Sequence, residues 1–315
     1  MKISIVIATT NRKSELEYSI NQYFKQSYQD FEILVMDNAS NDGTGEMIKE
    51  KYSDNEKIRY YRFEENLYFT AFNYGVWESK GDIIWVCDDD SNPRDTDCFE
   101  KVIEKFVKFP QIAILGTEDI EVNSNNSIWN WHPLEVDKHN IPEDGFKTCL
   151  FHGTGAGIRK EVFNKIGGFW GFGMEELDFT TRAIIAGYEA RYFPNIVTMH
   201  HNSPKMRFKE ERWIHMSSQV VKYNYKYFPF WKATGKVYPL LIIELFRAIA
   251  LRFRPLIILN AILSWKYFAI NTFRKEHTPI PKDKIKDVTL GVSTWKNQMK
   301  YIKYVINNKV FRKKS

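Results

Sequence analysis

Short apolar segments alternate with amphipathic segments over the first 115 residues. Runs of apolar, often β-branched residues, typical of strands buried on both faces, lie at 3–8, 31–36, 58–62, 82–87 and 112–115. Between them, patterns indicating helices lie at 13–26, 45–52, 70–79 and 96–108. This alternation predicts an α/β fold, with helices on both sides of a mostly parallel sheet.

Polar residues gather where three of these strands end. They are Thr9 to Arg12, Asp37 to Ser40, and Asp88 to Asp90, the last followed by a predicted turn at 91–93. In open α/β sheets, ligands bind in the crevice beyond the carboxyl ends of the strands. The three clusters therefore predict a single site.

Asp88, Asp89 and Asp90 place three adjacent carboxylates at the end of a core strand. Unpaired, their charges repel one another, and a divalent cation such as Mg²⁺ or Mn²⁺ relieves the repulsion. The alternative is a solvated acidic turn before the next helix. The chain has no glycine-rich nucleotide loop after its first strand, so a bound metal is the expected holder of any phosphates.

The chain between residues 153 and 182 carries further candidate functional residues. The glycines of 153–157 indicate close backbone approach to a ligand or a tight turn. Glu175, Glu176 and Asp178 open a predicted helix, where they either complement the helix dipole or supply a general base. Arg182, four residues after Asp178, is placed to pair with it.

A strand over 190–199 ends in His200-His201, a possible metal ligand for the carboxylate cluster. Three scattered cysteines without metal-ligand spacing suit a reducing compartment. The N-terminus begins directly with strand-like residues, so no signal peptide is expected.

The character of the chain changes near residue 207. Residues 1–201 hold 21 Lys+Arg and 33 Asp+Glu, whereas residues 202–315 hold 24 and 6, which gives nets of −12 and +18. Over 238–273, apolar runs with interspersed Arg, Lys and aromatic residues predict one or two amphipathic helices, broken near Pro255. These helices are expected either to bind an anionic membrane surface or to pack against the preceding part of the chain. No run of about 18 apolar residues predicts a membrane span, and no motif indicates nucleic-acid binding.

Taken in order, these motifs resemble a known family. The segments 4–12, 37–44, 88–90, 153–169 and 175–178 resemble those of family 2 glycosyltransferases with the GT-A fold. A histidine some two dozen residues after the acidic helix is similar to the layout of the galactofuranosyl- and rhamnosyltransferase-like subgroup. Glu176 and His200 have that separation, which favours His200 over His201.

The resemblance implies an inverting, metal-dependent transfer of a sugar from a nucleotide-diphosphate donor, a UDP- or dTDP-sugar. Glu176 is the implied base, with Glu175 and Asp178 as competitors. Asp88, Asp90 and His200 are the implied ligands of Mn²⁺ or Mg²⁺. The implied donor-binding residues are Thr9, Thr10, Asn11, Arg12, Asp37, Asn66, Asp88, Asp89 and Gly155.

The expected organisation is a GT-A catalytic domain over 1–205 followed by a basic, membrane-associating helical region over 206–315. Within the first, 1–115 would bind the nucleotide sugar and 116–205 would face the acceptor. That acceptor would be a cell-surface glycan or a lipid-linked molecule, at the cytoplasmic face of the cell membrane. The alternatives are a metal-dependent nucleotidyltransferase and a non-catalytic membrane-peripheral protein of glycan assembly.

Overall fold

A computed structural model describes residues 1–67, 69–122, 136–171, 173–201, 210–250 and 252–290. The chain divides into two compact units. The α/β unit comprises Met1–Gly171 and Glu175–Pro204, and the helical unit comprises Phe172–Met174 and Lys205–Ser315. The basic tail beyond residue 290, which the sequence links to a membrane surface, lies outside the described residues.

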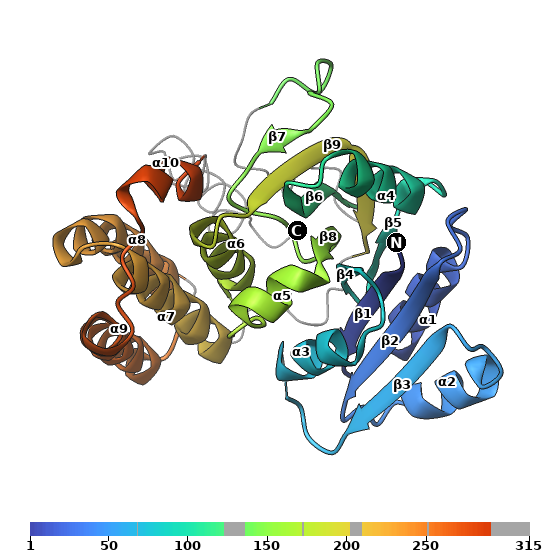
Figure 1. Ribbon diagram of the computed structural model, residues 1–315. Helices are drawn as coiled ribbons and strands as arrows, with labels where there is room; N and C mark the ends of the chain where they lie inside the picture. The colour runs from blue at the N-terminus through green and yellow to red at the C-terminus, as the bar shows by residue number, and fades with distance from the viewer. Residues whose placement is uncertain (68, 123–135, 172, 202–209, 251, 291–315) are drawn as a thin grey trace. The chain divides into compact units, whose positions relative to one another are not determined.

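One sheet forms the centre of the α/β unit (Figure 1). Its strands, within the described residues, are β1 (Ile3–Thr9), β2 (Phe31–Asn38), β3 (Ile58–Phe63), β4 (Ile83–Asp88), β5 (Ser91–Pro93), β6 (Ile112–Glu121), β7 (Phe146–Lys147), β8 (Ala156–Arg159) and β9 (Glu189–His200). They follow the order β3-β2-β1-β4-β8-β6-β9-β5, and β7 pairs with β9.

The sheet is parallel in its first half and mixed in its second. β3, β2, β1 and β4 are mutually parallel, as the alternation of strands and helices predicts. β8 runs antiparallel to both β4 and β6, whereas β6 and β9 are again parallel, so the second half departs from the predicted mostly parallel sheet mainly at β8, β5 and β7. The predicted turn at Ser91–Pro93 is wrong, because these residues form β5 and pair antiparallel with β9.

Helices cover both faces of this sheet. They are α1 (Lys13–Tyr23), α2 (Thr44–Tyr52), α3 (Phe69–Glu78), α4 (Cys98–Lys108), α5 (Lys160–Ile166) and α6 (Glu175–Ile185). Successive residues of a strand face opposite sides, so Ile5 packs with α1, α2 and α4, and Val6 packs with α3, α5 and α6. Both side chains are fully buried, which contributes about 1.5–3 kcal/mol each.

The helical unit contains α7 (Glu210–Tyr227), α8 (Phe230–Ala250) and α9 (Pro255–Lys275), followed by a short turn, Lys282–Lys284, and α10 (Ile285–Val288). The break near Pro255 is confirmed, since this proline is the first residue of α9. α7 carries much of the core: Trp213 is buried and packs edge-on against Trp265 of α9, with ring centroids 5.7 Å apart.

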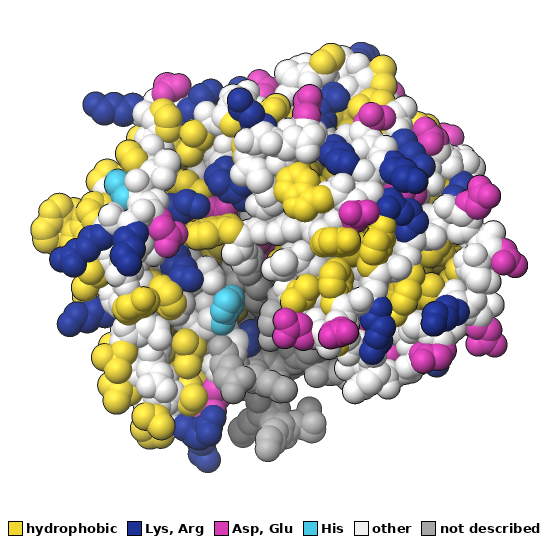
Figure 2. Space-filling model, turned by 60° about the horizontal axis from the view of Figure 1, so that its bottom comes forward, with side chains coloured by type: hydrophobic (Ala, Val, Ile, Leu, Met, Phe, Trp, Pro, Cys, Tyr) yellow, Lys and Arg dark blue, Asp and Glu magenta, His cyan; other side chains and the backbone are white. Residues whose placement is uncertain are grey.

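The outer helices of this unit expose many apolar side chains. Figure 2 shows hydrophobic side chains beside Lys and Arg on the helical unit, at the left of the view. Among the described helices, α9 alone is long and apolar enough to cross a membrane by length and composition, and 17% of the relevant window is buried. The expectation of no membrane span considered only consecutive apolar residues, so it did not single out α9, which carries a few polar ones.

Candidate functional site

The strand register brings the predicted polar clusters together. Thr9 of β1 lies beside Asp37 of β2, and Ala8 lies beside Asp88 of β4. All three strands are parallel, so their carboxyl ends meet at one edge of the sheet. The predicted convergence of the clusters is therefore confirmed.

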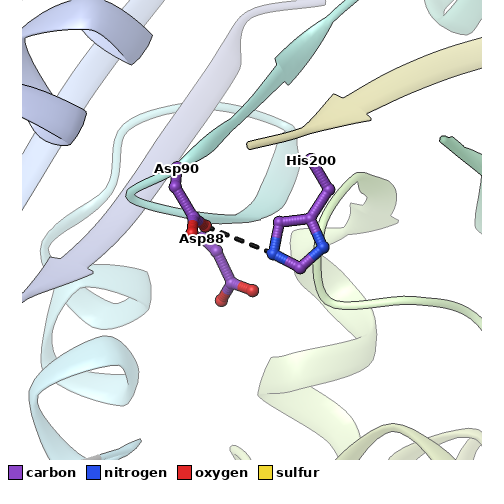
Figure 3. A group of neighbouring side chains, drawn as sticks. All are labelled: Asp88, Asp90 and His200. Atoms are coloured by element: carbon purple, nitrogen blue, oxygen red, sulfur yellow. Dashed lines mark ion pairs between the residues drawn. The ribbon is translucent and has the colours of Figure 1, made fainter. Parts of the chain in front are cut away.

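Asp88, Asp90 and His200 form one compact group (Figure 3). Each offers a ligand atom, and these atoms all lie within 4.8 Å of one another. Asp88 ends β4, whereas His200 ends β9, which β5 brings alongside through the pairing of Ser91 with His200. Two carboxylates and an imidazole suit Mn²⁺ or a similar divalent cation, so the residues present fit a metal ion.

An ion pair joins two members of this group. Nε2 of His200 lies 3.4 Å from Oδ1 of Asp90. Burial alone would raise the pKa of Asp90, but the contact with His200 and the charge of Arg12 lower it to about 2. Burial would likewise lower the pKa of His200, but Asp90 and Asp88 raise it to about 9. Protonated His200 thus balances part of the negative charge that a cation would otherwise balance.

Asp89 points into the protein rather than into this group. Thr9 Oγ1 donates to its Oδ2 at 2.7 Å, and Arg12 Nε lies 3.0 Å from its Oδ1. Arg12 also forms an ion pair with Asp90. Of the three adjacent aspartates, Asp88 and Asp90 face the potential metal position, and Asp89 anchors the end of β1 to the end of β4.

The loop after β1 is tied to the loop after β2. Thr10 Oγ1 donates to the carbonyl of Asn38 at 3.2 Å, and the Asn11 backbone N–H donates to Ser40 Oγ at 2.9 Å. Asn11 adopts a φ of 54°, a left-handed conformation that asparagine tolerates. Both loops thereby take a defined shape beside the carboxylates.

Asp37 is fully buried beneath the loop after β2. Its Oδ1 accepts from the Ser40 backbone N–H at 2.8 Å, and its Oδ2 accepts from Tyr60 and Arg62. Both oxygens therefore have protein partners. Asn66, the other donor-binding candidate of this region, is exposed on the segment between β3 and α3.

The acidic cluster begins α6, as predicted. Asp178 is fully buried and forms the predicted ion pair with Arg182, with Nε 2.7 Å from Oδ2. Glu176 is more accessible than Asp178. Its Oε1 lies close to Gly153, where an added Cβ atom would be 3.1 Å from this oxygen. Burial and the charge of Glu175 raise the pKa of Glu176 to about 8, and Asp88 contributes in the same direction.

The glycine-rich segment has a packing role that the sequence did not reveal. A Cβ at Gly155 would lie 2.2 Å from Thr198 Cγ2, and the Gly155 carbonyl accepts from Thr117 Oγ1 at 2.6 Å. Gly157 belongs to β8 and faces Phe106 of α4. At Gly155 and Gly157 the closely approaching groups are neighbouring side chains of the protein, so the predicted approach of a ligand stays a prediction.

The choice of His200 over His201 agrees with the geometry. His201 Nε2 lies 3.0 Å from Asn92 Oδ1, and its ring packs against Tyr18 with centroids 4.8 Å apart. Asp119 was not anticipated as a site residue. The sequence reading ended this strand at residue 115, whereas β6 continues to Glu121 and brings Asp119 within 3.9 Å of His200.

Comparison with known proteins identifies the family. The model of glycosyl transferase family 2 matches residues 4–167, about half of the chain. The probable glycosyltransferase YdaM of Bacillus subtilis (strain 168) is 24% identical over 243 residues, which cover 70% of this chain and 56% of that protein. A dolichyl N-acetyl-alpha-D-glucosaminyl phosphate 3-beta-D-2,3-diacetamido-2,3-dideoxy-beta-D-glucuronosyltransferase of Methanococcus voltae is 29% identical over 133 residues, 40% of this chain and 41% of that enzyme. This chain thus spans about half the length of these relatives.

Solved structures identify the fold. The mannosyltransferase PcManGT from Pyrobaculum calidifontis, in complex with GDP-Man and Mn²⁺, superimposes with a TM-score of 0.58 at 18% sequence identity. The superposition covers 86% of this chain and 84% of that one. The chain therefore belongs to glycosyl transferase family 2 and has the GT-A fold.

Proposed function

We propose that this enzyme is a metal-dependent, inverting glycosyltransferase that uses a nucleotide-diphosphate sugar. The observation that supports this most is the Asp88–Asp90–His200 group at the carboxyl ends of the strands. A carboxylate with a raised pKa, Glu176, lies near enough to Asp88 for their charges to interact. A metal-ligand set and a candidate base at one site are the parts that this reaction requires.

In this proposal, Asp88, Asp90 and His200 hold Mn²⁺ or Mg²⁺. The bound cation supplies Lewis-acid stabilisation of the departing diphosphate. The chain itself shapes the donor pocket with the two linked loops after β1 and β2, which carry Thr9 to Arg12 and Asp37. Asn66 and Gly155 are assigned to the same pocket on the family resemblance, whereas Asp89, also assigned to it there, would support the pocket by holding Thr9 and Arg12.

Glu176 is our choice for the base among the three acidic residues of α6. Asp178 forms an ion pair with Arg182 and is fully buried. Glu175 is also buried, whereas Glu176 is partly accessible and near Asp88. Ionised Glu176 removes the proton from the acceptor hydroxyl as its oxygen attacks the anomeric carbon. The nucleotide leaves from the opposite face, and this single displacement inverts the anomeric configuration.

For the donor we propose a UDP- or dTDP-sugar, and for the acceptor a lipid-linked molecule or a growing cell-surface glycan. The donor assignment rests on the resemblance to the galactofuranosyl- and rhamnosyltransferase-like layout. The acceptor assignment is supported by the Methanococcus voltae relative, whose name specifies a sugar carried on dolichyl phosphate. A membrane-anchored acceptor requires an enzyme that works at the membrane surface.

We also propose that the helical unit docks on the cytoplasmic face of the membrane. α9 exposes apolar side chains at the spacing of one helix face: Leu256, Leu259, Leu263, Tyr267 and Ile270. α8 exposes a comparable set: Trp231, Tyr238, Ile242, Phe246 and Ile249. Exposed cations, including Arg252, Arg254, Lys266, Arg274 and Lys275, add attraction to anionic lipids.

Packing favours a position of α9 along the membrane surface rather than across it. Trp265 of α9 is buried and donates its indole N–H to Ser217 Oγ of α7 at 2.9 Å. α7 carries exposed Arg212 and His215, which hydrocarbon would not accommodate. A helix that remains docked on α7 lies in the interface with its apolar stripe towards the lipid.

A donor screen that measures nucleotide release across UDP-, dTDP- and GDP-sugars tests the proposed reaction, with Mn²⁺ or Mg²⁺ and with EDTA. We expect turnover with added metal, a nucleoside diphosphate as product, and a loss of at least about 100-fold in Asp90→Ala. Release of pyrophosphate would instead indicate a nucleotidyltransferase. Full activity of Asp90→Ala would exclude the metal assignment, and unimpaired function of Glu176→Ala in cells would favour a non-catalytic role.

A further inference from the structure

The imidazole of His200 lies between two carboxylates. Its Nε2 faces Asp90 at 3.4 Å, and its Nδ1 faces Oδ2 of Asp119 at 3.9 Å. Asp119 lies on β6, which runs parallel to β9 with Asp119 paired to Thr198 and Glu121 to His200. The two opposite nitrogens of the ring therefore face different partners, only one of which belongs to the Asp88–Asp90–His200 group.

Burial of the Asp119 carboxylate within β6 is energetically unfavourable. The residue is only 6% exposed, and its Oδ1 has no hydrogen-bond partner among the residues that the structure describes. A buried carboxylate oxygen without a donor costs free energy. Burial also raises the pKa of Asp119, while the charges of His152 and His200 and the Thr154 hydroxyl lower it. The contact with Thr154 does not explain why Oδ2 of Asp119 faces Nδ1 of His200.

The chemistry of a histidine ligand supplies that reason. A neutral imidazole carries one N–H, so the nitrogen that binds a metal must be the other one. Metal-binding histidines generally donate that N–H to a carboxylate or carbonyl, which fixes the tautomer and the ring orientation. For Nε2 of His200 to serve the group with Asp88 and Asp90, the N–H must lie at Nδ1. Asp119 is the carboxylate that faces Nδ1.

We propose that Asp119 is a positioning residue, whose carboxylate accepts the Nδ1–H of His200 and directs Nε2 towards Asp88 and Asp90. This inference rests on the proposed role of those three residues as metal ligands. At 3.9 Å the pair is longer than a hydrogen bond. The proposal therefore requires the two groups to approach to about 3 Å when the ring is neutral. Without Asp119, the N–H at Nε2 would donate to Asp90 and would occupy the nitrogen that the metal needs.

Two measurements on the full-length protein test this inference. The ¹⁵N chemical shifts of the His200 ring, recorded on metal-free protein in alkaline buffer, report which nitrogen carries the proton. Electron paramagnetic resonance of free Mn²⁺ reports metal affinity directly, without a catalytic assay. The variants are Asp119→Leu, which removes the acceptor, and Asp119→Asn, which keeps an acceptor oxygen. Glu121→Gln is the matched control, since Glu121 is a buried acid on the same face of β6.

We expect the Nδ1–H tautomer in the wild type and in Asp119→Asn, and a shift towards Nε2–H in Asp119→Leu. We expect Mn²⁺ affinity to fall about 10–100-fold in Asp119→Leu, less in Asp119→Asn, and to stay unchanged in Glu121→Gln. An unchanged tautomer and affinity in Asp119→Leu would overturn the inference, as would an equal loss in Glu121→Gln. If the wild type itself binds no Mn²⁺, the metal proposal fails, and the metal-free spectra still decide whether Asp119 sets the tautomer.

Discussion

Oδ1 of Asp90 and Nε2 of His200 lie 3.4 Å apart, although Asp90 lies between β4 and β5 and His200 ends β9, much later in the sequence. Their contact depends on the pairing of β5 with β9, which places Ser91 opposite His200. It therefore requires β9 to lie beside β5. The contact therefore links the completion of the fold to the preparation of the proposed metal site.

The pH dependence of stability in metal-free protein should show this contact. Because folding raises the pKa of His200 to about 9, its contribution is fully present below the unfolded value of about 6.5. It is lost as the pH rises through 9. We expect His200→Gln to destabilise the protein near pH 6 by on the order of 2 kcal/mol and to matter little above pH 9.

Denaturant unfolding in EDTA across this pH range measures the difference between the two proteins. The exposed His139 provides the control, and we expect His139→Gln to track the wild type throughout. A difference for His200→Gln that is the same at every pH would contradict the assignment of an ion pair with Asp90.

Glu176→Gln should remove activity and increase stability at the same time. Folding raises the pKa of Glu176 from an ordinary value near 4.5 to about 8. Between these values the folded state binds more protons than the unfolded state, so stability falls as the pH rises through this window. Glutamine cannot ionise and avoids that loss. We expect a higher melting temperature for the variant, most clearly above pH 8, with turnover reduced by at least about 100-fold.

The same carboxylate should govern the pH profile of the wild type. Since the base must be ionised, kcat/KM should rise with pH up to about 8 and then level off. Glu175→Gln is the matched control because Glu175 is the adjacent acid on α6. A variant at Glu175 that lost activity as fully as Glu176→Gln would reject our choice between them.

Arg182→Ala should destabilise the protein strongly. The guanidinium pairs with buried Asp178 and donates to the carbonyls of Ile166 and Gly168 at 2.6 and 2.9 Å. Removing it leaves the Asp178 charge buried without its partner, which costs about 3–5 kcal/mol. Arg94→Ala breaks an exposed pair with Asp95 and should cost at most about 1 kcal/mol. Urea unfolding of the two variants measures both, and similar losses would contradict this ranking.

The sequence predicted the first half of the α/β unit well, and for a physical reason. β1, β2 and β4 are short apolar runs that end in polar residues, and parallel pairing of such strands is a local consequence of the intervening helices. Asp37 and the Asp88 to Asp90 cluster could therefore be placed together from the strand ends alone. The choice of His200 as their partner came from the family resemblance.

The second half depends on pairings that no local pattern specifies. β8 is only four residues long, with Gly157 in its centre, so its antiparallel insertion between β4 and β6 has no strand-like signal. β5 consists of Ser91–Pro93, residues that favour turns, and only its partner β9 makes it a strand. The predicted strand ended at residue 115, because the following residues of β6 are mostly polar and do not indicate a buried strand. Asp119 was therefore not placed beside His200.

The apolar stripe of α9 yields the last prediction. Leu259 and Leu263 are 51% and 56% exposed, whereas Gln111 is an exposed polar residue of the α/β unit. If this face docks on lipid, a charge at Leu259 or Leu263 must stay in water, and the docked state loses about 1.5–3 kcal/mol per side chain. We expect Leu259→Glu/Leu263→Glu to float poorly with vesicles that contain anionic lipid, and Gln111→Glu to float nearly as well as the wild type. Vesicles of neutral lipid should bind all three proteins weakly, because they offer no anionic headgroups to the exposed cations. Equal flotation of the double variant and the wild type on anionic vesicles would remove α9 from the proposed membrane surface.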